Sequence, residues 1–323
     1  MRLRLVPEVT NIDFFRYWRL TFGASVLAMI ASVLVFFILG LNFGIDFRGG
    51  TTIRTEAQAP VDIGAYRAAV SPLGFGDVAI TEVFDPSFGP DRNVAMVRIQ
   101  AQDGQEAKTP EQIAAIRAAL QQVDPTLIFA AVDSVGPKVS GELVQSAVLS
   151  VLLALGGVLF YIWLRFEWQF SVGAVLALVH DVVLTIGIFS ILQIRFDLAI
   201  IAALLTIVGY SLNDTVVVFD RVRENLIKYK KRPIKEVLNL SINETLSRTM
   251  MTSVTTLLAL IALFILGGDV IRGFVFAMIW GVIVGTYSSV FVASALLLWL
   301  GVKRDWSKVS GDQAGTQFGV KEN

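Results

Sequence analysis

The sequence predicts a polytopic α-helical membrane protein with six transmembrane helices and one α+β domain outside the membrane. Of the 323 residues, 54% are hydrophobic and only 17% are charged, whereas soluble domains carry about 25% charged residues. Six apolar stretches are long enough to cross the roughly 30 Å of hydrocarbon in a bilayer. One segment, 43–139, returns to the composition of a soluble domain. The surplus of apolar residues therefore belongs to membrane spans.

The spans follow directly from the apolar stretches. The first lacks a small-residue cleavage site and runs too long for a signal peptide, so we expect an uncleaved anchor. Together with the charge pattern below, the spans divide the chain into segments 1–19, 20–42, 43–139, 140–300 and 301–323. The six predicted helices are Leu20–Leu41, Glu142–Trp163, Phe170–Leu192, Leu198–Phe219, Met250–Leu266 and Phe274–Leu300.

Lys and Arg residues predict the orientation, because loops rich in these residues stay in the cytoplasm. The short loops on the other side carry only Arg195 and Arg272. We therefore expect cytoplasmic termini (1–19 and 301–323), a basic cytoplasmic loop at 220–249, and a periplasmic 43–139 segment, in a multi-pass protein of a bacterial inner membrane. The basic groups on the cytoplasmic side are Arg2, Arg4, Arg16 and Arg19; Arg165; Arg221, Arg223, Lys228, Lys230, Lys231, Arg232 and Lys235; and Lys303, Arg304 and Lys308.

Small residues predict close packing between spans. A ridge with a four-residue spacing runs along the last span, and a shorter one along the second. General richness in Gly and Ala accounts for the second ridge equally well. The ridges are Gly273, Ala277, Gly281, Gly285, Ser289 and Ala293, and Ala147, Ser150, Ala154 and Gly157.

The 43–139 segment predicts a ferredoxin-like α+β domain with the order βαββαβ. Thr109 is the expected N-cap of the second helix, and the segment Asp85–Arg92 is an expected turn. No catalytic constellation is visible in it, so contact with another protein is its expected role, with a pure spacer as the alternative. The expected elements are strand Thr51–Glu56, helix Val61–Ser71, strands Val78–Phe84 and Val94–Ala101, helix Pro110–Val123 and strand Leu127–Val135.

The composition also limits the chemistry. The absence of cysteine excludes disulfides and thiolate ligands, and a single histidine excludes a multi-histidine metal centre. The sequence has no G-x-x-x-x-G-K-[ST] pattern, so we expect no intrinsic ATP hydrolysis. No enzymatic activity, metal, cofactor or nucleic-acid partner is expected.

Asp214, in the fourth span, is the foremost candidate functional residue. It lies six residues before Asp220, about 9 Å inside the cytoplasmic end of the helix. Charges in a span cost about 2.5–3.5 kcal/mol on insertion scales, so they are functional candidates. Burial raises the pKa of a carboxyl group and a nearby cation lowers it, so a carboxyl group in a span can change its protonation state with conformation. Arg248, at the start of the fifth span, is the candidate cation; the alternative is an anchor bonded to Glu244.

His180 and Asp181 lie side by side in the middle of the third span. A lone histidine is more often a packing residue than a proton carrier, and the pair could neutralise itself. The adjacent carboxyl group is harder to explain at that depth, so both residues are secondary candidates for a proton relay, as is Asn213. The basic stretch Lys228–Lys235 suits anionic lipid head groups, and equally the ordinary orientation signal.

Three motifs resemble the SecF branch of the SecD/SecF protein-export family. Phe43–Gly50 reads FGIDFRGG, Val135–Leu143 reads VGPKVSGEL and Gly209–Asn225 reads GYSLNDTVVVFDRVREN. The resemblance covers nearly the whole chain except the tail after Arg304. The membrane core of that family is similar to resistance-nodulation-division transporters. The motif residues singled out are Gly44, Asp46, Phe47, Gly49, Gly50, Gly136, Pro137, Gly209, Asp220 and Arg221.

The resemblance implies an auxiliary subunit of the Sec preprotein translocase. The implied partners are SecD, the SecYEG channel, a YajC-type accessory subunit, unfolded preprotein and membrane lipid, and the implied energy source is the proton motive force. It also implies that Asp214 and Arg248 serve proton passage. Two alternatives remain: a proton-coupled exporter of lipids or small molecules, and a non-transporting scaffold for the Sec channel.

Overall fold

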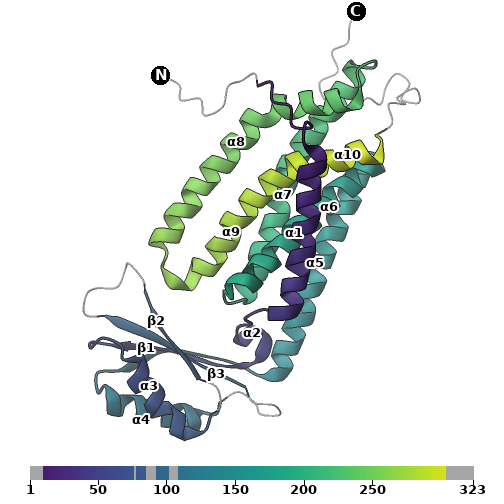
Figure 1. The fold of residues 1–323 in the computed structure, drawn as a ribbon. Helices are drawn as coiled ribbons and strands as arrows, with labels where there is room; N and C mark the ends of the chain where they lie inside the picture. The colour runs from purple at the N-terminus through teal and green to yellow at the C-terminus, as the bar shows by residue number, and fades with distance from the viewer. Residues whose placement is uncertain (1–9, 76–77, 85–91, 102–107, 303–323) are drawn as a thin grey trace, which may run out of the picture.

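The computed structural model describes residues 10–75, 78–84, 92–101 and 108–302. In this part of the chain, a bundle of long helices stands beside a small sheet covered by two helices (Figure 1). Six helical segments are long and apolar enough to cross a membrane, as the hydropathy pattern predicts. Five of them are α1 Trp18–Leu39, α5 Pro137–Arg165, α6 Trp168–Leu192, α7 Leu198–Lys228 and α8 Ile234–Leu266.

The sixth span is interrupted, although we expected one continuous helix. It consists of α9 Gly268–Ser288, a π-helical turn Ser289–Ala293 and α10 Ser294–Leu300. Within the turn the Ser294 hydroxyl donates to the carbonyl of Ser289, at 3.2 Å. A π turn widens the helix and shifts its direction, and α10 is turned away from the axis of α9 in Figure 1.

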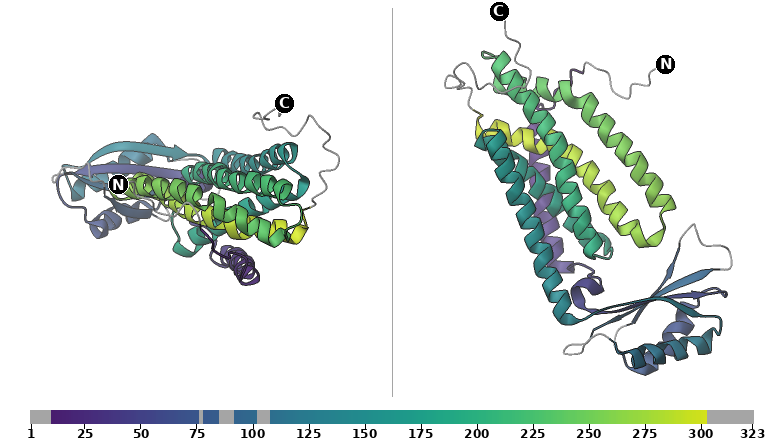
Figure 2. Two further views of the ribbon diagram at one scale, coloured as in Figure 1. Left: turned by 90° about the horizontal axis from the view of Figure 1, so that it is seen from above. Right: turned by 180° about the vertical axis from the view of Figure 1, so that it is seen from behind.

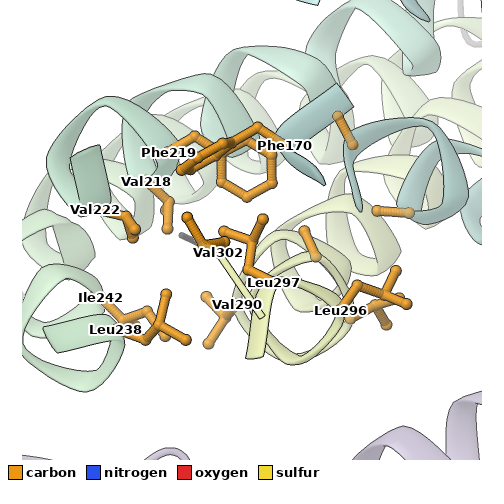
Figure 3. Close-up of a cluster of buried hydrophobic side chains, with 14 of the residues drawn as sticks. Phe170, Val218, Phe219, Val222, Leu238, Ile242, Val290, Leu296, Leu297 and Val302 are labelled. Carbon is orange, nitrogen blue, oxygen red and sulfur yellow. The ribbon is translucent and has the colours of Figure 1, made fainter. Parts of the chain in front are cut away.

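Helices replace most of the basic loop expected at 220–249. α7 continues to Lys228, and α8 begins at Ile234. The continuation is stable because its apolar face is covered: Val222 and Leu226 of α7 and Leu238 of α8 are fully buried. Figure 3 shows this cluster, in which both helices meet α6 and the turn after α9.

The small-residue ridge on α9 packs closely against α7, as its four-residue spacing predicts. A Cβ at Gly281 would collide with the side chain of Ile207 on α7, and one at Gly285 would lie 3.0 Å from Cβ of Ser211. The two backbones can approach this closely only because the side chains are missing. On α5, a Cβ at Gly157 would have no atom of the described residues within 4 Å, so this glycine is not needed for a close approach, whereas Ala147 of the same ridge is buried.

The α+β domain has the predicted ferredoxin-like arrangement, with sheet order β2-β3-β1-β4 and antiparallel neighbours throughout. Helices α3 and α4 cover the sheet face turned away from the bundle (Figure 2). Thr109 caps α4 in a capping box with Gln112, as expected. The expected turn Asp85–Arg92 falls almost wholly outside the described residues. The elements are β1 Gly50–Ala57, α3 Ile63–Val70, the 3₁₀ turn Ser71–Leu73, β2 Val78–Val83, β3 Asn93–Gln100, α4 Pro110–Val123 and β4 Ile128–Val135.

A short helix that the sequence analysis did not predict, α2 Ile45–Arg48, connects α1 to β1. It lies between the helical bundle and the sheet (Figure 1). The domain is therefore joined to the bundle covalently through α2 and through the start of α5. A further contact joins the residue after β2 to the first turn of α9, where the backbone N–H of Phe84 donates to a carboxylate oxygen of Asp269 at 2.7 Å.

Candidate intramembrane polar site

Two carboxyl groups are buried inside the helical bundle. Asp214 on α7 is 2% exposed and Asp181 on α6 is 1% exposed. A carboxyl group removed from water needs hydrogen-bond donors, a cation or a proton. The two residues meet this need in different ways.

Asp214 has a sparse set of partners. The Asn213 amide donates to Oδ1 of Asp214 at a long 3.5 Å, and Oδ2 has no hydrogen-bond partner among the described residues. The hydroxyl groups of Thr252 and Ser253 on α8 lie next to the carboxyl group. An acceptor oxygen left open in a buried place is where a proton or an approaching cation can bind.

Arg248 lies near this carboxyl group without touching it. Its charge acts on Asp214, yet within the described part of the chain no ion pair of 4.0 Å or less joins the two. The alternative partner, Glu244, accepts instead from Arg221 at 2.6 Å and from Asn225 at 2.7 Å. Arg248 is exposed at the side of α8. The guanidinium is therefore close to Asp214 and is not held there.

Asp181 has a nearly complete set of donors. Ser211 of α7 and Ser288 of α9 donate to Oδ2 at 2.6 Å and 2.8 Å, and Nδ1 of His180 lies 2.9 Å from Oδ1. Hydrogen bonds of this kind stabilise the charged form of a carboxyl group. Asp181 therefore holds α6, α7 and α9 together at one level.

His180 contacts α9 as well as Asp181. Its ring stacks on that of Tyr287, with centroids 6.2 Å apart, and its Nε2 has no hydrogen-bond partner in the described residues. The Tyr287 hydroxyl donates to the carbonyl of Thr21 at 3.1 Å and lies 3.0 Å from the Ser25 hydroxyl. A ring contact thus joins α6 to α9 at His180, and hydrogen bonds of Tyr287 join α9 to α1.

The surroundings of the two carboxyl groups are linked through α9. Thr286 lies two residues from Ser288, and its hydroxyl is 2.7 Å from that of Ser253. Ser211 lies three residues, nearly one turn, before Asp214 on α7. We call these residues the polar layer; it consists of Asp181, Ser211, Asp214, Ser253, Thr286 and Ser288.

Sequence reasoning identified both carboxyl groups of the polar layer and none of its hydroxyl residues as candidates; Ser211 lies within the third motif, and the other three lie in no motif. Ser253, Thr286 and Ser288 carry no charge that would single them out in the sequence. Hydroxyl residues in helices also commonly bond to their own backbone. Their one signal is position: Ser288 lies beside the small-residue ridge of α9, where helices approach closely enough for a short side chain to reach across.

The residues of the first motif meet at α2. The N–H of Gly44 donates to the carbonyl of Phe196 at 2.8 Å, and Oδ2 of Asp46 accepts from the N–H of Leu198 at 3.1 Å. Gly49 and Gly50 have φ values of +74° and +140°, which other residues rarely adopt. Phe47 packs against an apolar cluster of the helical bundle.

The remaining motif residues lie at helix ends or on the surface. Gly136 is the N-cap of α5 and Pro137 its first residue, a favoured place for proline. Asp220 lies 4.0 Å from Arg165, both half exposed, and Arg221 pairs with Glu224 and Glu244. A Cβ at Gly209 would meet no atom of the described chain within 4 Å.

Comparison with known proteins identifies the family. Residues 115–303 match the family described as "Protein export membrane protein SecD/SecF, C-terminal", and residues 34–61 match "SecD/SecF GG Motif". A "Protein translocase subunit SecF" of Cereibacter sphaeroides is 61% identical over 98% of both chains. One of Vibrio alginolyticus is 43% identical over 94% of both chains.

A solved structure agrees with these matches. SecDF of Thermus thermophilus, a translocon-associated membrane protein, superposes with a TM-score of 0.81 at 37% identity over 93% of this chain. The present chain spans 40% of the length of that SecDF chain. The chain is a multi-pass inner-membrane protein with a role in protein transport, and it belongs to the SecD/SecF family as a SecF-type translocase subunit.

Proposed function

We propose that this subunit pairs with SecD and uses the proton motive force to drive a late stage of preprotein export, with Asp214 as the protonated group. The observation that carries the proposal is the state of Asp214: buried, with one carboxylate oxygen unpartnered among the described residues and a cation nearby but not bound. A carboxyl group in this position is stable when neutral and attracts Arg248 when charged.

The change of charge moves helices because the two groups lie on different ones. With Asp214 protonated, α7 and α8 keep the arrangement of the structure, in which the Tyr210 hydroxyl of α7 donates to the Thr256 hydroxyl of α8 at 3.3 Å. After the proton leaves, the carboxylate draws Arg248 inward, and α8 must move relative to α7. One elementary charge that crosses the membrane supplies about 2.3 kcal/mol per 100 mV, which shifts a two-state equilibrium by more than about tenfold.

The other candidates have supporting roles in this proposal. Asn213 donates to Asp214 and orients it. Asp181, held by two serine hydroxyl groups, and His180 form a secondary relay towards α1. Arg248 carries no proton, since guanidinium stays charged, and acts only as the counter-charge. Transport, without a chemical step, is the proposed activity.

The orientation of the chain belongs to the same proposal. We place both termini in the cytoplasm and the α+β domain in the periplasm, on the basis of Lys and Arg in the loops. The domain then lies where preprotein emerges from SecYEG. A YajC-type subunit and anionic lipids at the basic ends of α7 and α8 complete the proposed set of partners.

The lipid-exporter alternative predicts a large apolar cavity between the domain and the bundle. The cavity found there, about 340 Å³, has charged side chains in its lining, including Arg98, Arg195 and Arg272, together with apolar ones, including Phe264, Phe274 and Phe276. Burial lowers the pKa of Arg98 to about 10, and the charge of Arg195 adds to the effect. A larger apolar groove of about 620 Å³ lies among α1, α2, α5, α6 and α7, and none of the described sheet residues lines it. The relatives named as translocase subunits favour the export role.

The test compares Asp214→Asn with Asp220→Asn in the intact translocase. Asp220 lies on the same helix, and its side chain is 45% exposed. We expect Asp214→Asn to assemble with SecD and to lose the gradient-dependent stage of export, while Asp220→Asn retains it. Unchanged gradient-dependent export in Asp214→Asn would refute the proposal, and it would favour the scaffold alternative.

A further inference from the structure

The first turn of α7 is capped by a residue far away in the sequence. The first N–H groups of a helix have no partner within the helix, and the N-cap residue usually supplies one. Asp197, at the N-cap of α7, makes no capping bond, and its carboxylate accepts from Nε of Arg195 at 3.2 Å. Asp46 of α2, 152 residues away, accepts from the N–H of Leu198 instead. A negative charge at this end is also favourable for the helix dipole.

Backbone contacts support this cap on the α7 side. The N–H of Gly44 donates to the carbonyl of Phe196 and the N–H of Phe196 donates to the carbonyl of Asn42, both at 2.8 Å. The rings of Phe43, Phe47 and Phe196 pack together with centroids 5.8–6.1 Å apart. Residues 42–48 are therefore attached to the start of α7 by backbone, side-chain and ring contacts.

On its other side α2 is attached to the middle of the sheet. Gly50 begins β1, the strand that pairs with both β3 and β4, and its register partners are Gln100 and Val135. A Cβ at Gly50 would lie 2.5 Å from the carbonyl oxygen of Ile99. The step from α2 to β1 is thus tightly packed, so a displacement of α2 moves the central strand with it.

We propose that Asp46 is a positioning residue that transmits movement of α7 to the α+β domain. The proposal rests on the proposed role of Asp214, which lies on the same helix 16 residues, about 24 Å, from Leu198. A rigid helix carries a displacement over that length. The Asp46 contact then passes it to α2, and β1 passes it to the sheet.

The test separates coupling from proton passage. Asp46→Ala removes the acceptor, and Asp46→Asn keeps a side-chain oxygen. The matched control is Asp62→Ala, which removes the local cap of α3, where Oδ1 of Asp62 accepts from the N–H of Ala65 at 2.9 Å. Each variant is paired with its SecD and assayed for proton flux and for gradient-dependent export.

We expect Asp46→Ala to conduct protons normally and to lose gradient-dependent export, whereas Asp46→Asn and Asp62→Ala retain both. Hydrogen exchange should accelerate at the first amides of α7 in Asp46→Ala alone. Retained export in Asp46→Ala, or loss of proton flux together with export, would overturn the inference. Failure of the proposed function would give a different result. In that case Asp214→Asn would show normal gradient-dependent export, independently of the result for the Asp46 variants.

A disulfide variant distinguishes loss of the contact between residues 42–48 and α7 from general misfolding of Asp46→Ala. The chain has no native cysteine, and Phe43 and Phe196 are bridge partners. A Phe43→Cys/Phe196→Cys disulfide in the Asp46→Ala background should restore gradient-dependent export, and reduction should remove it again. Export that stays absent with the disulfide formed would contradict a transmitting role for this contact.

Discussion

Replacement of Ser288 by alanine tests the description of Asp181 as a clamp between three helices. The change removes the 2.8 Å hydrogen bond from the Ser288 hydroxyl and leaves the 2.6 Å bond from Ser211. Hydrogen bonds to charged groups contribute about 1.5–3 kcal/mol in soluble proteins, and those between membrane helices average about 0.6 kcal/mol, with a maximum near 1.7. Because Asp181 is buried and accepts both bonds at one oxygen, we expect a loss of about 1–2 kcal/mol in unfolding free energy.

The double variant decides how the carboxyl group responds. If both serines are replaced, the two losses are not independent, because both hydroxyl groups donate to the same carboxylate oxygen. The loss of unfolding free energy in the double variant should therefore be about 1 kcal/mol smaller than the sum of the losses in the two single variants. This difference is within the usual range for residues that share a partner.

The assay is unfolding of the purified protein in mixed detergent, followed by the signal of its tryptophans. Ser150→Ala is the matched control, because the Ser150 hydroxyl donates to the carbonyl of Ser146 in its own helix. The control should change stability by much less than Ser288→Ala. Equal stability of the two variants would refute the clamp.

Three further predictions concern other parts of the structure. Gly50→Ala should destabilise the α+β domain, because its φ is +140° and a Cβ would press on β3; proteolysis of the domain measures this. The hydrogen bond from Arg92 holds the pKa of Glu56 below its ordinary value. The stability from this pair is present above the ordinary pKa and lost as pH falls through the lowered one, which circular dichroism at acid pH follows. Gly281→Leu should collide with Ile207 and prevent assembly of the bundle, as gel filtration would show.

The spans and the α+β domain could be predicted from the sequence because each carries a local signal. About 20 apolar residues in a row are typical of a membrane span and rare elsewhere, and strand, helix and cap patterns marked the domain. The extensions of α7 to Lys228 and of α8 back to Ile234 were missed. Their polar faces lower the mean hydropathy, and only tertiary contacts such as those of Leu226 and Leu238 reveal their buried side.

The candidate site was predictable only where a charge marked it. Asp214, Asp181 and Arg248 stood out because charged residues are rare in spans. Ser288 did not, because its role depends on which helix faces Asp181. The cap by Asp46 depends on a contact across 152 residues, which no local pattern encodes.

The most direct test of the energy-coupling account is infrared difference spectroscopy of the carboxyl groups in membranes before and after a proton gradient is applied. We predict that a protonated-carboxyl band changes with the gradient in the native protein, is absent in Asp214→Asn and persists in Asp220→Asn. The same gradient-induced band in Asp214→Asn would show that another group carries the proton, and it would contradict the account.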